Sequence, residues 1–326
     1  MPRFDLPLEQ LRTYRPEVAE PADFDAFWAE TLAQSRALAA PTRIVRIDSP
    51  LTLVDVHDLT FTGFGGDEVR AWYLAPAGAS GPLPTIVEYN GYGGGRGLPH
   101  ERIQWATSGY AYVFMDTRGQ GSVWGTGGAT ADPHGTGPSA PGFMTRGIDD
   151  PRGYYYRRVF TDAVRLIDEV RGLELVDPER VLVTGGSQGG GIALAAAGLC
   201  EGLRGVMADV PFLCHFERAV GLTEAYPYQE IVQYLSVHRD LVAQTFRTLS
   251  YFDGVNFARR ATAPALISTA LHDQVCPPST VFAAANHYGA DVQVEVFPFN
   301  QHEGGQGFQW EAQARWARDL LDAEIS

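Results

Sequence analysis

One stretch constrains the fold of this chain more than any other. It joins a short apolar run to a glycine-rich turn and then to a run of small residues. Val181–Thr184 has the apolar and β-branched character of a buried strand, and Gly189–Ala197 suits a helix that packs closely on a sheet. Between them, Gly185–Gly189 reads G-G-S-Q-G, a match to the G-x-S-x-G turn that connects a strand to a helix. This order predicts that Ser187 stands above a sheet as a nucleophile, with free helix N–H groups beside it.

The competing interpretation of the turn is an ordinary glycine-rich loop that holds phosphate. A P-loop needs G-x-x-x-x-G-K-[ST], which the chain lacks, and G-x-G-x-x-G is not matched at this turn either. The chain has no lysine, because all 25 basic positions are arginine. That absence also excludes a pyridoxal-phosphate Schiff base and a serine–lysine dyad.

Composition narrows the class of protein and its partners. A chain of 326 residues with 45% hydrophobic and 20% charged residues suits one large α/β domain or two small ones. The net charge of −14 would repel polyanions, so nucleic acid and anionic membrane surfaces are not expected as partners.

The cysteines and the N-terminal residues indicate in which cellular compartment the protein is expected. Cys200, Cys214 and Cys276 are odd in number and show no C-x-x-C spacing, so a disulfide framework is not expected. The opening residues lack the apolar core of a secretory signal, and no apolar run is long enough to span a membrane. A cytoplasmic protein is the expectation.

Alternating strand and helix patterns predict a mostly parallel, doubly wound α/β sheet. The expected strands are Val54–Phe61, Val69–Leu74, Thr85–Asn90, Ala111–Asp116, Val181–Thr184, Gly205–Val210, Ala263–Ala270 and Val292–Phe297. The first two strands flank a glycine turn and predict an antiparallel hairpin at the edge of the sheet. We expect one domain over residues 1–326, with a helical lead-in over 1–42 and a helical insertion over the site at 211–262.

A second glycine-rich loop, Gly91–Gly95, follows the strand Thr85–Asn90. Open α/β sheets bind ligands at the carboxyl ends of their strands. In the α/β-hydrolase arrangement the loop after the third strand supplies one backbone N–H for an oxyanion, and Tyr92 is the expected donor. A mobile surface loop is the alternative that the sequence leaves open.

A serine nucleophile needs a histidine base, and the base needs a carboxylate. The α/β-hydrolase order is serine, acid, then histidine. His302 follows the strand Val292–Phe297 directly, whereas His287 lies within an expected helix and is interpreted as a packing residue. Asp273 follows the strand Ala263–Ala270 and is the expected acid, although a turn or cap role is the competing interpretation.

A metal cofactor is not expected. His302-Glu303 does not continue as H-E-x-x-H, because position 306 is glutamine. No group of residues has the spacing of a zinc site. We therefore expect catalysis without cofactors.

Several motifs together resemble the acetyl xylan esterase/cephalosporin C deacetylase family, the seventh carbohydrate esterase family, of the α/β-hydrolase superfamily. The likeness covers nearly the whole chain. The motifs that carry it are Phe4–Leu8, Asp25–Trp28, Arg118–Ser122 (R-G-Q-G-S), Gly185–Gly189, Cys276–Thr280 and His302-Glu303. Val123 departs from the signature, which has a second serine there.

The resemblance implies an esterase that removes acetyl groups from sugars and from cephalosporin C without a metal. It implies a catalytic triad of Ser187, Asp273 and His302, with an oxyanion hole formed by the backbone N–H groups of Tyr92 and Gln188. It also implies a hexamer, with the hairpin Val54–Leu74 at the interface.

The side chains that line the substrate site are less constrained. Tyr92 and Trp124 are expected to line it, and Phe212 to limit the acyl group to short chains. Two alternatives remain open: a serine peptidase or acyl-peptide hydrolase, and an inactive binding protein with the hydrolase fold.

Overall fold

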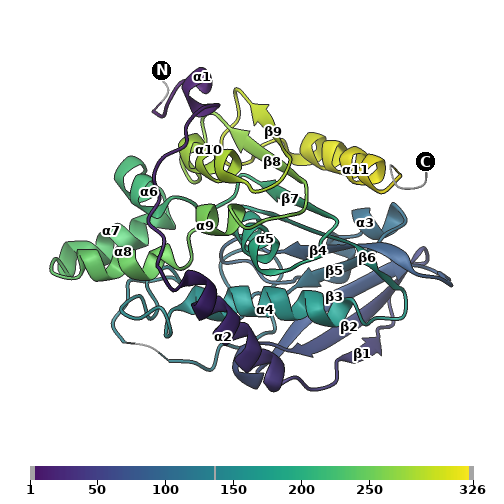
Figure 1. The fold of residues 1–326 in the computed structure, drawn as a ribbon. Coiled ribbons are helices and arrows are strands. Elements are labelled where there is room, and N and C mark those ends of the chain that lie inside the picture. The colour runs from purple at the N-terminus through teal and green to yellow at the C-terminus, as the bar shows by residue number, and fades with distance from the viewer. Residues whose placement is uncertain (1–3, 136, 323–326) are drawn as a thin grey trace.

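The structure, a computed structural model, describes residues 4–135 and 137–322. Its centre is a nine-stranded sheet in the order β1-β2-β3-β5-β4-β6-β7-β8-β9 (Figure 1). The strands are β1 (Arg43–Arg46), β2 (Val54–Thr62), β3 (Glu68–Pro76), β4 (Leu83–Tyr89), β5 (Ala111–Met115), β6 (Val176–Gly186), β7 (Gly205–Asp209), β8 (Ala265–Ala270) and β9 (Val292–Phe297). The mostly parallel α/β sheet expected from the sequence is confirmed, since all neighbouring strands from β5 to β9 pair in parallel.

The antiparallel part of the sheet comprises β1, β2 and β3. The β2–β3 hairpin is confirmed, and β3 pairs antiparallel with β5. The hairpin lies at the edge of the parallel strands, as predicted, and β1 extends the sheet by one more strand along β2. All four residues of β1 are exposed, so its sequence has no buried alternation that would have marked it as a strand.

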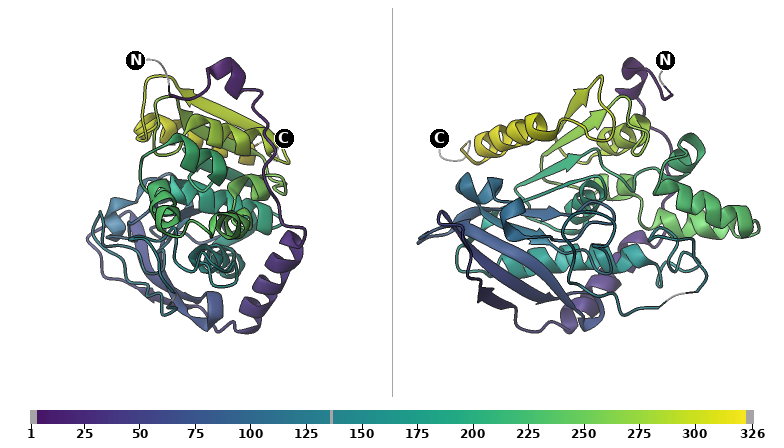
Figure 2. Two further views of the ribbon diagram at one scale, coloured as in Figure 1. Left: turned by 90° about the vertical axis from the view of Figure 1, so that its left-hand side faces the viewer. Right: turned by 180° about the vertical axis from the view of Figure 1, so that it is seen from behind.

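Helices cover both faces of the sheet (Figures 1 and 2). On one face lie α2 (Phe24–Ala37), α4 (Tyr155–Val170), α5 (Gln188–Leu199), α9 (Gly254–Ala258) and α10 (Pro278–His287). On the other lie α3 (Gln104–Thr107) and α11 (Gln306–Asp322). Strand β6 shows why both faces need cover, because Val181 and Val183 join the first core and Leu182 joins the second.

The remaining helices lie near the two ends of the sheet. Helix α1 (Leu8–Leu11) contacts α10. After β7 the chain forms α6 (Phe216–Leu222), α7 (Tyr228–Val237), α8 (Val242–Ser250) and α9. Figure 1 shows α6, α7 and α8 extending to one side of the sheet, so the segment after β7 is largely helical, as the sequence predicted.

The three cysteines are free and buried. Within residues 4–135 and 137–322, none of the helices combines the length and the apolar character that a membrane crossing requires. Burial raises the pKa of the Cys200 thiol to about 12, so this cysteine acts as a small core residue.

Candidate active site

Ser187 occupies the tight turn between β6 and α5. Its backbone has φ 56° and ψ −117°, in the left-handed region that a residue with a side chain rarely adopts. A Cβ on Gly189 would lie 2.1 Å from the carbonyl oxygen of Tyr89, and a Cβ on Gly185 would lie 2.4 Å from the backbone of Gly189. The glycines of the motif are therefore required by close backbone packing, and the strained serine projects from the carboxyl end of β6.

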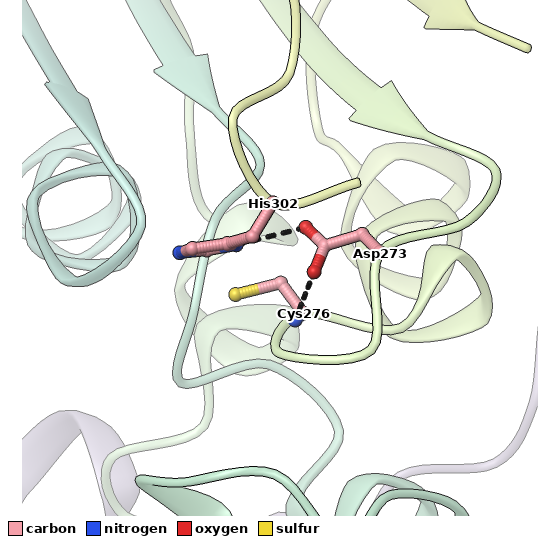
Figure 3. Close-up of side chains that lie close together, drawn as sticks. All are labelled: Asp273, Cys276 and His302. Carbon is pink, nitrogen blue, oxygen red and sulfur yellow. Dashed lines mark hydrogen bonds and ion pairs between the residues drawn. The ribbon is translucent and has the colours of Figure 1, made fainter. Parts of the chain in front are cut away.

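Hydrogen bonds connect the three residues that the sequence singled out. His302 Nε2 lies 3.0 Å from Ser187 Oγ, and His302 Nδ1 lies 2.9 Å from Asp273 Oδ2. His302 comes from the loop after β9 and Asp273 from the loop after β8, and Figure 3 shows the imidazole directed at the carboxylate. The structure thus brings together a hydroxyl, an imidazole and a carboxylate in the order that activates a serine.

The Asp273 carboxylate is held in place by the backbone. It is fully buried, and its Oδ1 accepts hydrogen bonds from the N–H groups of Val275 at 2.8 Å and Cys276 at 2.9 Å. Its Oδ2 is left for His302. Because both oxygens are engaged, the carboxylate can fix the tautomer and orientation of the imidazole.

The loop after β4 lies next to the serine turn because β4 and β6 are neighbours in the sheet. This is where the strand order reverses, since β5 lies on one side of β4 and β6 on the other. Among the described residues, none accepts a hydrogen bond from the N–H of Tyr92. Gln188 opens α5, where N–H groups lack partners within the helix. Two donors are thus available near Ser187.

Gln120 connects these two donor segments, and the sequence analysis missed its role. Its Oε1 accepts from the N–H of Gly93 at 2.7 Å, and its Nε2 donates to Gln188 Oε1 at 2.9 Å. Gln188 Nε2 in turn donates to the carbonyl of Asn90 at 3.1 Å. Gln120 belongs to the R-G-Q-G-S motif, but the motif alone does not tell which side chains it contacts.

The hydroxyl of the Tyr92 side chain is anchored by two hydrogen bonds. Its hydroxyl donates to Glu230 Oε1 of α7 and accepts from the N–H of Phe143, both at 2.5 Å. Burial raises the pKa of Glu230 and also that of Tyr92. Glu230 therefore links the segment after β7 to the loop that carries the Tyr92 N–H. No sequence motif predicted this contact.

The other two expected site-lining residues differ in exposure. Trp124 is 46% exposed, and its Nε1 donates to the carbonyl of Tyr92 at 2.6 Å. Its ring covers Gly94, where a Cβ would lie 2.3 Å from it. Phe212 is fully buried, with ring centroids 6.3 Å from Tyr92 and 4.3 Å from Tyr228. Trp124 thus supports the Tyr92 loop from outside, and Phe212 supports it from inside.

A cysteine, Cys276, also lies beside His302. The ligand atoms of Asp273, Cys276 and His302 lie within 4.8 Å of one another, a proximity that the sequence did not predict (Figure 3). Metal ligation needs a thiolate, whereas burial raises the pKa of the Cys276 thiol well above its usual value. Asp273 and His302 are already paired with each other. The group therefore fits a hydrogen-bonded catalytic relay better than a metal centre.

Comparison with known proteins points to one family. The acetyl xylan esterase (AXE1) family model matches residues 1–320. The structure of an acetyl xylan esterase from a Paenibacillus species is 40% identical, covers 96% of this chain and 99% of its own, and superposes with a TM-score of 0.90. Acetyl xylan esterase 1 from a Thermoanaerobacterium species is 33% identical over 97% of this chain and 99% of its own, with a TM-score of 0.89.

Among curated proteins, acetyl esterase Axe7A of Xylanibacter ruminicola is 28% identical over 300 residues, or 88% of this chain. The chain spans 65% of the length of that relative. The match of the family model over nearly the whole chain and the two full-length structural matches identify the family. The chain therefore belongs to the acetyl xylan esterase (AXE1) family of carboxylic ester hydrolases, with the α/β-hydrolase fold.

Proposed function

We propose that this chain is a serine esterase that removes acetyl groups from acetylated sugars, including xylo-oligosaccharides, and from cephalosporin-type esters. The observation that carries the proposal is the hydrogen-bonded line from Ser187 through His302 to Asp273. Family membership supports the acetyl ester as the substrate.

In the first step, Ser187 Oγ attacks the ester carbonyl while His302 Nε2 accepts the hydroxyl proton. Asp273 stabilises the imidazolium that forms, through its hydrogen bond to Nδ1. The tetrahedral intermediate collapses with cleavage of the C–O bond, and His302 gives the proton to the departing alcohol. An acetyl group then remains on Ser187.

In the second step, water attacks the acetyl-serine. His302 accepts one proton of the water and returns it to Ser187 Oγ as acetic acid leaves, which then ionises in water to acetate. The acid–base cycle closes with His302 neutral, so the chemistry needs no redox group or external proton source.

The backbone N–H groups of Tyr92 and Gln188 stabilise the oxyanion of both intermediates. Removal of one such donor typically lowers kcat by about 10²–10³-fold. The Gln120 bridge supports this assignment, because it holds the two donor segments against each other. We infer that Tyr92 and Phe212, whose ring centroids lie 6.3 Å apart, limit the acyl group to short chains such as acetyl.

Substitution Ser187→Ala tests the proposal. Loss of the nucleophile is expected to lower kcat for an acetylated xylo-oligosaccharide by at least about 10⁴-fold, with an unchanged fold by circular dichroism. Ser108→Ala, at an exposed serine after α3, is the matched control and should retain full activity. Activity of the Ser187 variant near that of the wild type would refute the mechanism.

The expected hexamer is also part of the proposal. Ile44 and Val45 of the outer strand β1 are 41% and 48% exposed, which leaves an apolar strand edge beside the β2–β3 hairpin for self-association. Light scattering coupled to size-exclusion chromatography would give the mass directly, and a monomer would exclude the assembly.

A further inference from the structure

Glu230, in the first turn of α7, is a buried carboxylate that the catalytic steps do not use. The residue is 3% exposed. Its Oε1 accepts from the Tyr92 hydroxyl at 2.5 Å, and its Oε2 accepts from the N–H of Met144 at 3.0 Å. The Tyr92 hydroxyl in turn accepts from the N–H of Phe143 at 2.5 Å. One carboxylate thus joins the tip of the Tyr92 side chain to the segment around Met144.

That segment is shaped around the carboxylate. Gly142 has φ 119°, and a Cβ there would lie 2.1 Å from Glu230 Oε1, so a larger residue would push the two apart. Burial raises the pKa of Glu230, whereas hydrogen bonds from Tyr92 and Met144 and the charge of Arg146 act in the opposite direction. Two donors, a nearby cation and a glycine that allows close approach are the features of a site built for an ionised carboxylate.

The loop Gly91–Gly94 has hydrogen bonds at every N–H group except one. The N–H groups of Gly91, Gly93 and Gly94 have acceptors at 2.9, 2.7 and 3.3 Å. The N–H of Tyr92 has no acceptor in the part of the chain that the structure describes. The loop is therefore fixed by its own bonds around the single donor that we assign to the oxyanion hole.

Three side chains hold Tyr92, each through a different group. Trp124 Nε1 donates to its carbonyl at 2.6 Å, and Gln120 Oε1 accepts from the next N–H, that of Gly93. These two bonds fix the peptide after Tyr92, whereas Glu230 fixes the far end of the side chain. Because the backbone nitrogen and the side chain are attached to the same Cα, restraint of the ring also restrains the direction of the N–H. A misplacement of about 1 Å at a catalytic group can lower a rate by about 10²-fold.

We propose that Glu230 is a positioning residue for the esterase reaction, because it anchors the Tyr92 side chain and so directs the Tyr92 N–H at the oxyanion. The inference rests on the proposed function, in which this N–H is one of the two oxyanion donors. It adds a group outside the catalytic triad, a carboxylate of α7, on which the geometry of the oxyanion hole depends.

Glu230→Gln tests the role without a change in side-chain size. The substitution replaces one carboxylate oxygen by an amide nitrogen, which cannot accept from the Tyr92 hydroxyl or the Met144 N–H. With para-nitrophenyl acetate, kcat and kcat/KM are expected to fall together by about tenfold, because the oxyanion forms in the transition state. KM should stay within about twofold of the wild-type value. A rise in KM with kcat unchanged would overturn the proposal.

A double-mutant cycle with Tyr92→Phe tests whether Glu230 acts through the Tyr92 hydroxyl. Tyr92→Phe removes the hydroxyl but leaves the bond between Glu230 and Met144, and is expected to lower kcat by about tenfold on its own. If both residues act through one bond, the double variant should also lose about tenfold, whereas independent effects would multiply to about 100-fold. A loss of about 100-fold in the double variant would refute the route through the hydroxyl.

Glu224→Gln is the matched control, because it removes an exposed carboxylate shortly before α7 and should retain the wild-type kcat. Circular dichroism checks that each variant is folded. If Glu230→Gln does not fold, Tyr92→Phe decides the proposal alone, since it keeps the buried carboxylate and its bond to Met144. An unchanged kcat for Tyr92→Phe, or equal losses for Glu224→Gln and Glu230→Gln, would contradict the positioning role.

Failure of the proposed function would look different. If Ser187→Ala cleaved the acetate as fast as the wild type, the esterase mechanism would be wrong whatever Glu230 does. An enzyme that depends on Ser187 but keeps its kcat in Glu230→Gln and Tyr92→Phe would retain the mechanism and refute the positioning role.

Discussion

Arg118 and Gln120 stand two residues apart in the loop after β5, yet they enter two different polar clusters. Arg118 pairs with Asp162 of α4 through two bonds of 2.6 and 2.8 Å, and with Asp67 of the hairpin turn at 2.8 Å. Gln120 bonds to Gly93 and Gln188 beside the nucleophile. The first cluster is charged and joins the antiparallel strands to α4, whereas the second is neutral and joins the Tyr92 loop to the start of α5.

Loss of one partner should lower the stability of the fold more in the charged cluster than in the neutral one. Arg118 is fully buried, and although burial alone would lower its pKa, Asp162, Asp67 and Asp132 raise it. A buried charge that loses its partner keeps the full cost of desolvation. Removal of one partner from the neutral cluster should cost less stability, because the carboxamide left behind carries no net charge.

The comparison teaches that one short motif can supply two separate properties. The arginine determines whether three elements stay together, and the glutamine determines where two N–H groups point. A neutral bridge suits the proposed oxyanion hole, because a charge beside it would itself alter the stabilisation of a developing anion.

Replacement of Arg118 should have the largest effect. Arg118→Met leaves Asp162 buried without its cation and is expected to lower the free energy of unfolding by about 3–5 kcal/mol. Arg36→Gln is the matched control, because Arg36 forms an equally bidentate pair with Asp168 but its side chain is 48% exposed. That control should cost at most about 1 kcal/mol in urea unfolding. If both variants lost the same free energy of unfolding, burial of the Arg118 pair would not explain its effect.

Replacement of Gln120 should affect activity more than stability. Gln120→Leu removes the acceptor for Gly93 and the bond to Gln188, and is expected to lower kcat by about 10–100-fold with little change in KM. Unfolding in urea should show a loss of about 1–3 kcal/mol. Gln104→Leu, at an exposed glutamine of α3, should change neither quantity. A stability loss as large as that of Arg118→Met, with kcat intact in the folded fraction, would contradict the division of roles.

The smallest expected effect is a dependence of stability on pH, which should appear in the charged cluster around Arg118 and not in the neutral cluster around Gln120. Burial alone would raise the pKa of Asp67, but hydrogen bonds from Arg118 and His134 lower it below its ordinary value. A carboxylate with a lowered pKa contributes stability above its unfolded pKa of about 4 and loses it as pH falls through the folded value. Asp67→Asn should therefore be less stable than the wild type near neutral pH.

The difference between Asp67→Asn and the wild type should shrink as the pH falls below about 4. Urea unfolding at several pH values measures it. The loss caused by Gln120→Leu should stay constant over the same range, because neither Gln120 nor Gln188 titrates. A pH-independent deficit for Asp67→Asn would show that the carboxylate acts only through packing.

The sequence by itself determined the succession of β2 to β9 and the identity of the three residues that meet at the sheet edge. Ser187, Asp273 and His302 each follow an apolar strand directly, and parallel strands bring their carboxyl ends to one edge. Because these signals are local, they could be recognised from short motifs. Their catalytic roles remain the prediction that substitution must test.

Only the tertiary structure decided which side chains connect distant segments. Gln120 meets Gln188 across 68 residues of sequence, and Tyr92 meets Glu230 across 138. A pocket beside Ser187 likewise joins the end of β7 to the start of α11. A side chain chooses such partners by orientation and burial, which depend on how the elements pack and leave no periodic pattern in the sequence.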